Sequence, residues 1–222
     1  MVAGTAQLHL AHMTRILIAD DCEVVRLGLR QTLEAHPDWE VVAEAADGKE
    51  AILEAIASKP DVAVVEYALP VMNGIEVTQH LRRRLPRIEI LIFTRCEDEA
   101  LVFDLLSAGA RGYLLKSDAK RYLLEAVASL AAHRPFFTDR ISEALLQSFL
   151  TRCNRTRTTL TNRERSVVQL IAEGHTNRKI GALLGIGVKT VETHRAAIMR
   201  KLNLASSAAL VRYAVRNQLV EL

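Results

Sequence analysis

The 222-residue sequence contains little cysteine, glycine or proline, the residues whose abundance is typical of disulfide-rich, collagen-like and low-complexity proteins. Its three cysteines, Cys22, Cys96 and Cys153, form no CxxC pair, which excludes a disulfide framework and a zinc ribbon and favours reduced thiols. Ten glycines and five prolines exclude collagen-like and low-complexity classes. No stretch reaches the roughly 18 uncharged apolar residues of a membrane span, and the first thirteen residues lack a secretory-signal pattern. We therefore expect a globular, cytoplasmic protein without a membrane partner, whose residues 1–13 form a disordered tail.

Charge is divided unevenly along the chain. Residues 1–150 carry 16 Lys and Arg against 22 Asp and Glu, a balance of −6, whereas residues 151–222 carry 13 against 4, a balance of +9. A small module this basic favours a polyanion partner such as nucleic acid, because Lys and Arg displace the counterions condensed on phosphates. A solvated basic surface with no such partner is the alternative.

Short apolar, β-branched runs alternate with segments of helical periodicity from residue 14 to about residue 134. This alternation is typical of an α/β domain with a doubly wound parallel sheet, and it predicts five strands. The predicted strands are Arg15–Ala19, Trp39–Glu44, Val62–Val65, Glu89–Phe93 and Gly112–Leu115. The helices predicted around them are Val24–Ala35, Gly48–Ser58, Asn73–Leu85, Glu97–Ala108 and Ala119–Ala131.

Polar residues follow four of these strands. They are Asp20 with Asp21, Glu66, Thr94 and Lys116. Parallel sheets place their sites at the carboxyl ends of the strands, so we expect these side chains to converge. Three carboxylates can bind a hard cation such as Mg²⁺, and the lysine and hydroxyl can bind a phosphoryl group. The alternative is that each is an ordinary polar strand end near solvent.

The segments Asp20–Asp21, Glu66–Gly74, Thr94 and Ser107–Lys116 resemble bacterial receiver domains. In that family an aspartate after the third strand accepts phosphate from a histidine kinase. The resemblance implies a metal site at Asp20, Asp21, Glu66 and Ala68, and a switch formed by Thr94, Tyr113 and Lys116.

The phosphoacceptor position departs from the family pattern, because it holds Glu66 instead of aspartate. The extra methylene moves the carboxylate about 1.5 Å and changes the geometry of in-line attack, so phosphorylation by a kinase is not expected. Glu66 then either supplies a permanent negative charge that biases Thr94 and Tyr113 toward the active arrangement, or belongs to a degenerate scaffold fixed in one state.

The C-terminal part is predicted to be helical. A helix at Asp139–Leu150 and a polar, basic linker at Thr151–Thr159 complete the connecting segment 135–159. The domain 160–222 then contains four helices, the first beginning with a Thr161–Glu164 capping box and the third running over Val188–Leu202. The second and third form a helix-turn-helix, in which the later helix enters the major groove of DNA.

The predicted Val188–Leu202 helix has two distinct faces. Val191, Ile198 and Leu202 share an apolar stripe that can pack on Ile180 and Leu184. The opposite stripe, which fits base edges, contains Lys189, Glu192, Thr193, Ala196 and Arg200. Side chains better placed for phosphates are Arg178, Thr190, His194 and Arg195. A packing helix with an ordinary solvated face is the alternative.

The segment Leu160–Leu202 resembles the LuxR-type output domain, and both resemblances together are those of a NarL/FixJ-type response regulator. Gly187 stands where that family often has a serine cap. The resemblance implies a homodimer that binds an inverted repeat through the last helix around Ala208 to Ala214. Residues 181–190 are similar to a phosphate-binding loop, but Val188 separates its glycine from Lys189, so no enzyme is expected.

We therefore predict a sequence-specific transcription regulator that acts without phosphorylation. The competing hypothesis is a receiver-like dimerisation or ligand-sensing module with little or no specific DNA binding. Salt dependence of DNA binding separates the two.

Overall fold

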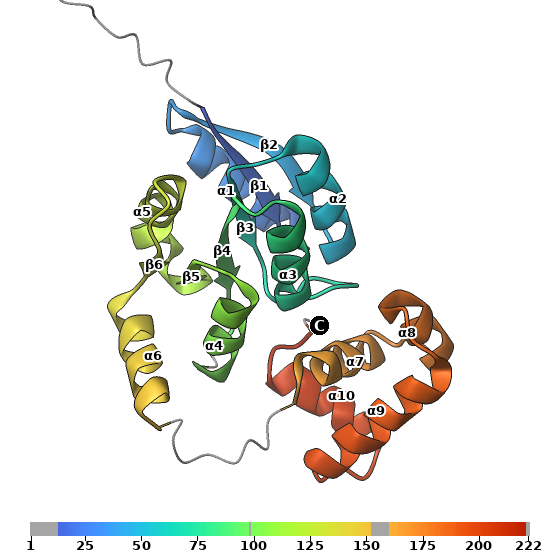
Figure 1. The fold of residues 1–222 in the computed structure, drawn as a ribbon. Coiled ribbons are helices and arrows are strands. Elements are labelled where there is room, and N and C mark those ends of the chain that lie inside the picture. Colours follow the sequence, from blue (N-terminus) through green and yellow to red (C-terminus); the bar gives the residue numbers. More distant parts are fainter. Residues whose placement is uncertain (1–12, 98, 152–159, 221–222) are drawn as a thin grey trace, which may run out of the picture.

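The computed structural model describes residues 13–97, 99–151 and 160–220 (Figure 1). Its N-terminal part is built on one parallel sheet with the strand order β2-β1-β3-β4-β5-β6. The strands are β1 (Thr14–Ala19), β2 (Trp39–Ala45), β3 (Val62–Val65), β4 (Glu89–Thr94), β5 (Gly112–Leu115) and β6 (Phe136–Phe137). The burial of β3, β4 and β5 along their whole length explains their continuous apolar sequence, because helices cover both faces of such a sheet.

Helices cover the two faces of the sheet in separate groups. α1 (Glu23–Glu34) and α5 (Ala119–Ala131) pack on one face, where Leu29, Leu33 and Leu123 join an apolar core. The other face is covered by α2 (Gly48–Ser58), α3 (Gly74–Arg84) and α4 (Glu99–Ala108). A short 3₁₀ turn, η1 (Lys116–Asp118), connects β5 to α5. The α/β class and the doubly wound arrangement are confirmed.

The prediction of five strands was wrong, because β6 adds a sixth strand at the edge of the sheet. Phe136 and Phe137 pair with Gly112 and Tyr113 of β5, and the Phe136 N–H donates to the Arg111 oxygen at 3.0 Å. Two residues are too short to produce an alternating pattern, so this strand depends on the neighbouring edge of β5 and has no local signal.

After β6 the chain is helical. The remaining helices are α6 (Asp139–Thr151), α7 (Asn162–Ala172), α8 (Asn177–Leu184), α9 (Val188–Lys201) and α10 (Ser207–Arg216). The predicted capping box is present, since Thr161 accepts from the Glu164 N–H and Glu164 accepts from the Thr161 N–H. Thr176 caps α8, and α8 ends at Gly185 with φ 65°. Val191, Ile198 and Ile180 are fully buried, as the apolar stripe predicted.

Two predicted segments lie outside the described residues. These are residues 1–12 of the predicted tail and residues 152–159 of the predicted linker, which include Cys153. Of the described cysteines, Cys22 is exposed and Cys96 is buried, and both are free thiols. Among the described residues, no helix is both long and apolar enough to cross a membrane.

The helical module packs against the sheet domain through α7 and α10 (Figure 1). These helices lie beside α3 and α4, and the apolar core on that face of the sheet continues into α7, α9 and α10. The two modules therefore share one hydrophobic core at their junction.

Candidate functional site

Lys116 links two carboxylates at the carboxyl ends of the strands. Its Nζ atom lies 2.6 Å from Asp20 Oδ2 and 2.6 Å from Glu66 Oε2. Both carboxylate side chains are 1 % exposed, and that of Lys116 is 13 % exposed. The sheet order explains the meeting, because β1 and β3 are neighbours and β5 is two strands away. The structure thus brings together three of the residues that the sequence placed at strand ends.

The second oxygen of Glu66 is bound by the main chain of its own loop. Glu66 Oε1 accepts from the Tyr67 N–H at 2.6 Å and from the Ala68 N–H at 3.1 Å. The Thr94 side chain also hydrogen-bonds to the Glu66 carboxylate. Both oxygens are therefore engaged, and the carboxylate is fixed between Lys116, Thr94 and the loop after β3.

The electrostatics of this site are set by burial and by Lys116. Burial raises the pKa of Glu66, and Lys116, Thr94 and the Ala68 N–H oppose this effect by stabilising the carboxylate. Burial by itself lowers the pKa of Lys116, but Glu66 and Asp20 outweigh it, so the pKa of this lysine is raised. The site therefore holds a charged lysine that two buried acids share.

Two further switch residues, Thr94 and Tyr113, are buried beside this site. The Tyr113 hydroxyl donates to the Cys96 main-chain oxygen, and the Cys96 N–H donates to Thr94 Oγ1 at 3.2 Å. Cys96 therefore connects the two residues through its own peptide groups. The predicted switch pair is therefore physically linked.

The predicted metal site is not assembled as a set of free oxygen ligands. Asp20 Oδ1 accepts from the Cys22 N–H at 3.0 Å, Asp20 Oδ2 faces Lys116, and both oxygens of Glu66 are engaged. Asp21 is exposed, and Ala68 directs its N–H to Glu66. No group of three or more His, Cys, Asp or Glu side chains in the described ranges is arranged to hold a metal ion. The residues as they lie do not fit a divalent cation shared by Asp20 and Glu66, because the ammonium of Lys116 lies 2.6 Å from an oxygen of each acid and takes the position between them.

The loop that follows Glu66 contacts the helical module directly. Gln169 Nε2 of α7 donates to the Leu69 main-chain oxygen at 2.6 Å in a buried contact. Arg165 of α7 pairs with Asp104 of α4, and both side chains are largely buried. Arg163 lies 3.7 Å from Glu76 of α3. These contacts join the sheet domain to the first helix of the helical module.

Val71 has a backbone conformation that its side chain disfavours. Its φ is 68°, which is rare for a β-branched residue, and the Met72 N–H donates to the Pro70 oxygen at 2.7 Å across this tight turn. The Glu173 carboxylate after α7 hydrogen-bonds to the Val71 main chain. Burial raises the pKa of Glu173, and also that of Glu76 at the same junction. The strained turn is thus held partly by the helical module.

The outer face of α9 is open to solvent. Every member of the predicted base-contacting stripe is exposed, namely Lys189, Glu192, Thr193, Ala196 and Arg200. α9 lies on the side of its module away from α3 and α4 (Figure 1). The face of α9 that was predicted to contact base edges is therefore accessible in the described structure.

The residues predicted to contact phosphates differ in their exposure to solvent. Arg178 and Thr190 are exposed, whereas His194 and Arg195 are half-buried. Arg195 hydrogen-bonds to Asn177 Oδ1 at 3.5 Å and to the Ser207 hydroxyl, so it also connects α8 and α10. At the predicted dimer segment Ala208 is exposed, but Ala214 is fully buried in its own module.

Sequence patterns did not identify all the residues of these sites. Gln169 is a polar residue inside the apolar run Val167–Ile171, and this mismatch is a signal that could have marked it. Cys96 carries no such signal, because a lone cysteine is an ordinary core component.

Both parts of the chain match known protein families. Residues 16–128 match the family model described as response regulator receiver domain, and residues 158–214 match bacterial regulatory proteins, luxR family. The chain is 36 % identical to the transcriptional regulatory protein LiaR of Bacillus subtilis, over 94 % of this chain and 100 % of that protein. It is 37 % identical to the oxygen regulatory protein NreC of Staphylococcus aureus, over 93 % of this chain and 99 % of that protein.

A solved structure supports the same similarity. RcsB from Salmonella enterica serovar Typhimurium, bound to promoter rprA in the presence of phosphomimetic BeF₃⁻, superposes with a TM-score of 0.69 at 26 % identity. The match covers 90 % of this chain and 97 % of that chain. The similarity therefore extends over both modules.

Proposed function

The chain belongs to the two-component response regulators that join a receiver domain to a LuxR-type DNA-binding domain, and from this membership we propose that it is a sequence-specific transcription regulator whose receiver domain acts without phosphorylation. The family consists of transcription regulators and is not an enzyme class. We propose the boundaries 14–134 for the receiver domain, 135–159 for the connecting helix and linker, and 160–222 for the DNA-binding domain.

The exposed face of α9 supports the DNA-binding part of this proposal. Lys189, Glu192 and Thr193 lie on this face, and no other element covers them in the described structure. A lysine can donate to guanine, a glutamate can accept from cytosine, and a threonine can bind either base. The balance of +9 over residues 151–222 supplies attraction to phosphates. Arg178, Thr190, His194 and Arg195 are assigned to the DNA backbone, and Arg200 to the far end of the groove.

The contacts of Glu66 carry the proposal of phosphorylation independence. Lys116 and Thr94 are the residues expected to respond to a phosphoryl group, and both already bind the Glu66 carboxylate. A permanent negative charge therefore does part of what a phosphoryl group would do, and the longer side chain places that charge toward these two partners. Tyr113 is buried next to Thr94 in this arrangement, and we propose that Glu66 stabilises it.

Receiver domains commonly bind Mg²⁺ at their acidic site. In this chain Lys116 lies between Asp20 and Glu66 and supplies one positive charge to this pair of acids. We propose that Lys116 provides part of the charge balance that the cation supplies elsewhere in the family, with Asp21 and Ala68 contributing no ligand. A histidine kinase partner is then not required for DNA binding.

DNA binding as a homodimer to an inverted repeat completes the proposal. It is supported by the RcsB structures that are described as bound to promoter DNA. The exposed Ala208 is a suitable contact on α10, whereas Ala214 faces its own core.

Footprinting on a genomic DNA library tests the proposal. We expect unphosphorylated protein to protect specific sites, with affinity that falls steeply as salt rises. Replacing Lys189 and Thr193 by alanine should relax specificity and weaken binding, at a cost of about 1–3 kcal/mol for each lost base contact. Glu143→Gln on α6, an exposed acid far from α9, is a matched control. Equal binding to random duplexes at every salt concentration would instead support the ligand-sensing or dimerisation module.

A further inference from the structure

The connection from α3 to β4 is strongly basic within an acidic domain. Residues 82–87 read RRRLPR, whereas residues 1–150 as a whole carry a balance of −6. Arg83, Arg84 and Arg87 are exposed. Cations in the last turn of a helix offset its dipole, which accounts for Arg83 and Arg84 at the end of α3 but not for Arg87 beyond that end. The cluster therefore exceeds what the stability of α3 requires.

Two further exposed cations lie at the same edge of the sheet, where the strands begin. Lys59 precedes β3 and Arg134 precedes β6. Strands β3, β4, β5 and β6 are consecutive neighbours and adjacent strands lie about 4.8 Å apart, so the connections before them form a row about 14 Å long. The exposed cations of this row, hereafter the basic edge, are Lys59, Arg83, Arg84, Arg87 and Arg134.

The side chains of the basic edge have no partner within the described structure. None of them forms an ion pair or a hydrogen bond with another described residue. The acids closest to them in the chain are engaged elsewhere. The Glu89 side chain is 4 % exposed and pairs with Arg111 and His133, and Asp61 accepts the Arg15 N–H at 2.9 Å. The positive charges of the basic edge therefore face solvent without an ion-pair partner.

Two other arginines fix the loops that carry this charge. Arg82 donates to the Ile88 oxygen at 2.8 Å across the α3–β4 connection, and its stem packs on Gly109, where an added Cβ would lie 2.8 Å from Arg82 Cγ. Arg111 donates to the His133 oxygen at 2.8 Å and so holds the loop before β6. These bonds order both loops and leave the exposed cations unused, which lowers the cost of binding a partner.

The composition of the basic edge fits phosphate groups better than a protein surface. Protein interfaces are built around aromatic and apolar anchors, and none of the large exposed apolar side chains of the described structure lies in the connections before β3, β4, β5 or β6. Arginine donates forked hydrogen bonds that match a phosphate, and most hydrogen bonds between proteins and DNA are made to its backbone. A charged row without apolar anchors is therefore suited to a nucleic-acid backbone.

We propose that the basic edge binds the phosphate backbone of duplex DNA, independently of its sequence. The carboxyl edge of the same sheet contacts α7 through Leu69 and Gln169, so the basic edge lies at the end of the receiver domain away from the DNA-binding domain (Figure 1). Short DNA is stiff, and one duplex does not lie on α9 and on this edge together. The chain therefore bridges two duplexes, and only this bridging rests on the function proposed above.

Fluorescence anisotropy of a short labelled duplex of random sequence tests the site in the full chain. The starting protein carries Lys189→Ala and Arg200→Ala, which remove two cations of α9, and we expect it to retain salt-dependent binding. Adding Arg83→Gln, Arg84→Gln and Arg87→Gln should weaken this binding about tenfold or more at low salt. The slope of log affinity against log salt concentration should fall by about two to three, because three phosphate contacts are lost. Unchanged binding overturns the proposal.

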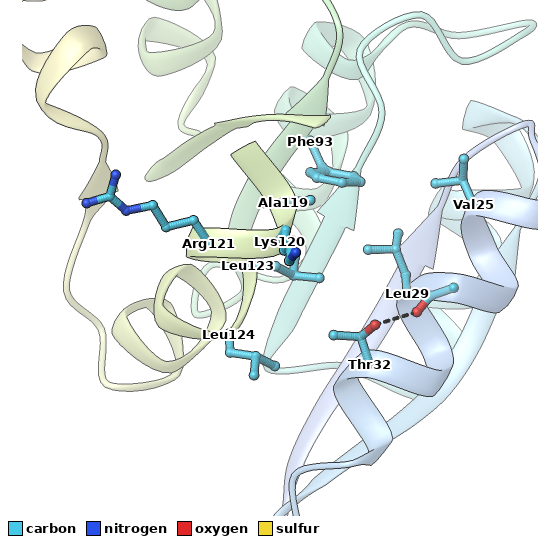
Figure 2. A pocket seen from close by; sticks show the side chains of 10 residues that line it. Val25, Leu29, Thr32, Phe93, Ala119, Lys120, Arg121, Leu123 and Leu124 are labelled. Atoms are coloured by element: carbon cyan, nitrogen blue, oxygen red, sulfur yellow. Dashed lines mark hydrogen bonds between the residues drawn. The ribbon is translucent and has the colours of Figure 1, made fainter. Parts of the chain in front are cut away.

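The matched control removes the same amount of charge from the opposite edge of the sheet. It combines Lys49→Gln at the start of α2 with Lys120→Gln and Arg121→Gln at the start of α5, which Figure 2 shows. Made in the same starting protein, this triple variant should bind duplex within about twofold of it, since its charges lie outside the contact. Thermal unfolding followed by circular dichroism checks that every variant folds. An equal loss in both triple variants assigns the effect to net charge and overturns the proposal.

Two further comparisons identify the partner and separate this proposal from the one above. If poly-glutamate, or vesicles that contain phosphatidylglycerol, bind the basic edge more tightly than duplex at the same salt, the partner is an acidic protein or a membrane and the proposal is wrong. Random duplex that binds the basic edge, while footprinting finds no specific site, supports this proposal and contradicts the function proposed above. Specific footprints from a chain whose basic edge binds no duplex have the reverse meaning.

Discussion

The Gln169 side chain donates a buried hydrogen bond to the main-chain oxygen of Leu69, a residue 100 positions earlier in the chain. Leu69 belongs to the loop that begins at Glu66, and Gln169 belongs to the first helix of the DNA-binding domain. A change in this loop therefore acts on α7 without any intermediate element. The strained turn at Val71, which Glu173 contacts, lies in the same loop.

Restoring aspartate at the acceptor position should restore phosphorylation. We expect Glu66→Asp to gain one phosphoryl mass from acetyl phosphate and Mg²⁺, and the wild type to gain none, because the shorter carboxylate retreats from Lys116 and regains the in-line geometry. Intact-protein mass spectrometry measures the gain. If the wild type itself acquires a base-labile phosphoryl group, Glu66 has not ended the chemistry. If Glu66 mimics activation, the wild type should bind DNA as tightly as phosphorylated Glu66→Asp.

Removing Lys116 should destabilise the receiver domain strongly. Lys116→Met leaves Asp20 and Glu66 as buried carboxylates without their cation, which costs about 3–5 kcal/mol of unfolding free energy. Urea unfolding followed by Trp39, the single tryptophan, measures the loss. Lys49→Met, at an exposed lysine of α2, is the control. Adding Glu66→Gln to Lys116→Met should recover part of the loss, and no recovery would show that the ion pair contributes little.

Docking of the two domains should weaken as pH rises. Burial raises the pKa of Glu173 and of Glu76 at the junction, so the docked form binds protons more tightly than the separated form. The stabilisation of the docked form by these two protonated carboxyl groups is fully present below the ordinary carboxyl pKa. It is lost as pH rises through the raised pKa of Glu173 and of Glu76. Small-angle X-ray scattering should therefore show a larger radius of gyration at higher pH.

The double variant Glu76→Gln and Glu173→Gln is the control for this pH dependence. It removes both titrating carboxyl groups but retains the neighbouring His80 and His175. Its radius of gyration should change less between the same pH values. An unchanged pH dependence would contradict the assignment of the effect to Glu76 and Glu173.

A serine at the start of α9 should stabilise the DNA-binding domain slightly. Gly187 is the N-cap, has extended φ and ψ of −66° and 149°, and makes no side-chain cap bond. The nearest atom to an added Cβ is Thr190 Oγ1 at 3.8 Å, so serine fits without displacement. We expect Gly187→Ser to gain a few tenths of a kcal/mol and Gly187→Ala to lose stability. Thermal unfolding followed by far-ultraviolet circular dichroism compares the three proteins.

Local patterns were sufficient for most of the secondary structure. The run Val62–Val65 and the helices Gly48–Ser58 and Ala119–Ala131 have the predicted limits, because the first is a short continuous apolar run and the two helices have clear helical periodicity. Strand β6 was missed because two residues have no period. The contacts of Arg195 with Asn177 and Ser207 were also missed, because they depend on how α8, α9 and α10 pack.

The sequence alone determined the two-module composition, the alternation of strands and helices, the polar face of α9 and the presence of glutamate at position 66. These features follow from local residue order, which sets periodicity, capping and charge. Only the tertiary structure decided that Lys116 would bridge Asp20 and Glu66, and that Gln169 would bond to the loop after Glu66. Such contacts join residues far apart in the chain, and they form only when the sheet order and the packing of the two domains bring those residues into hydrogen-bonding distance.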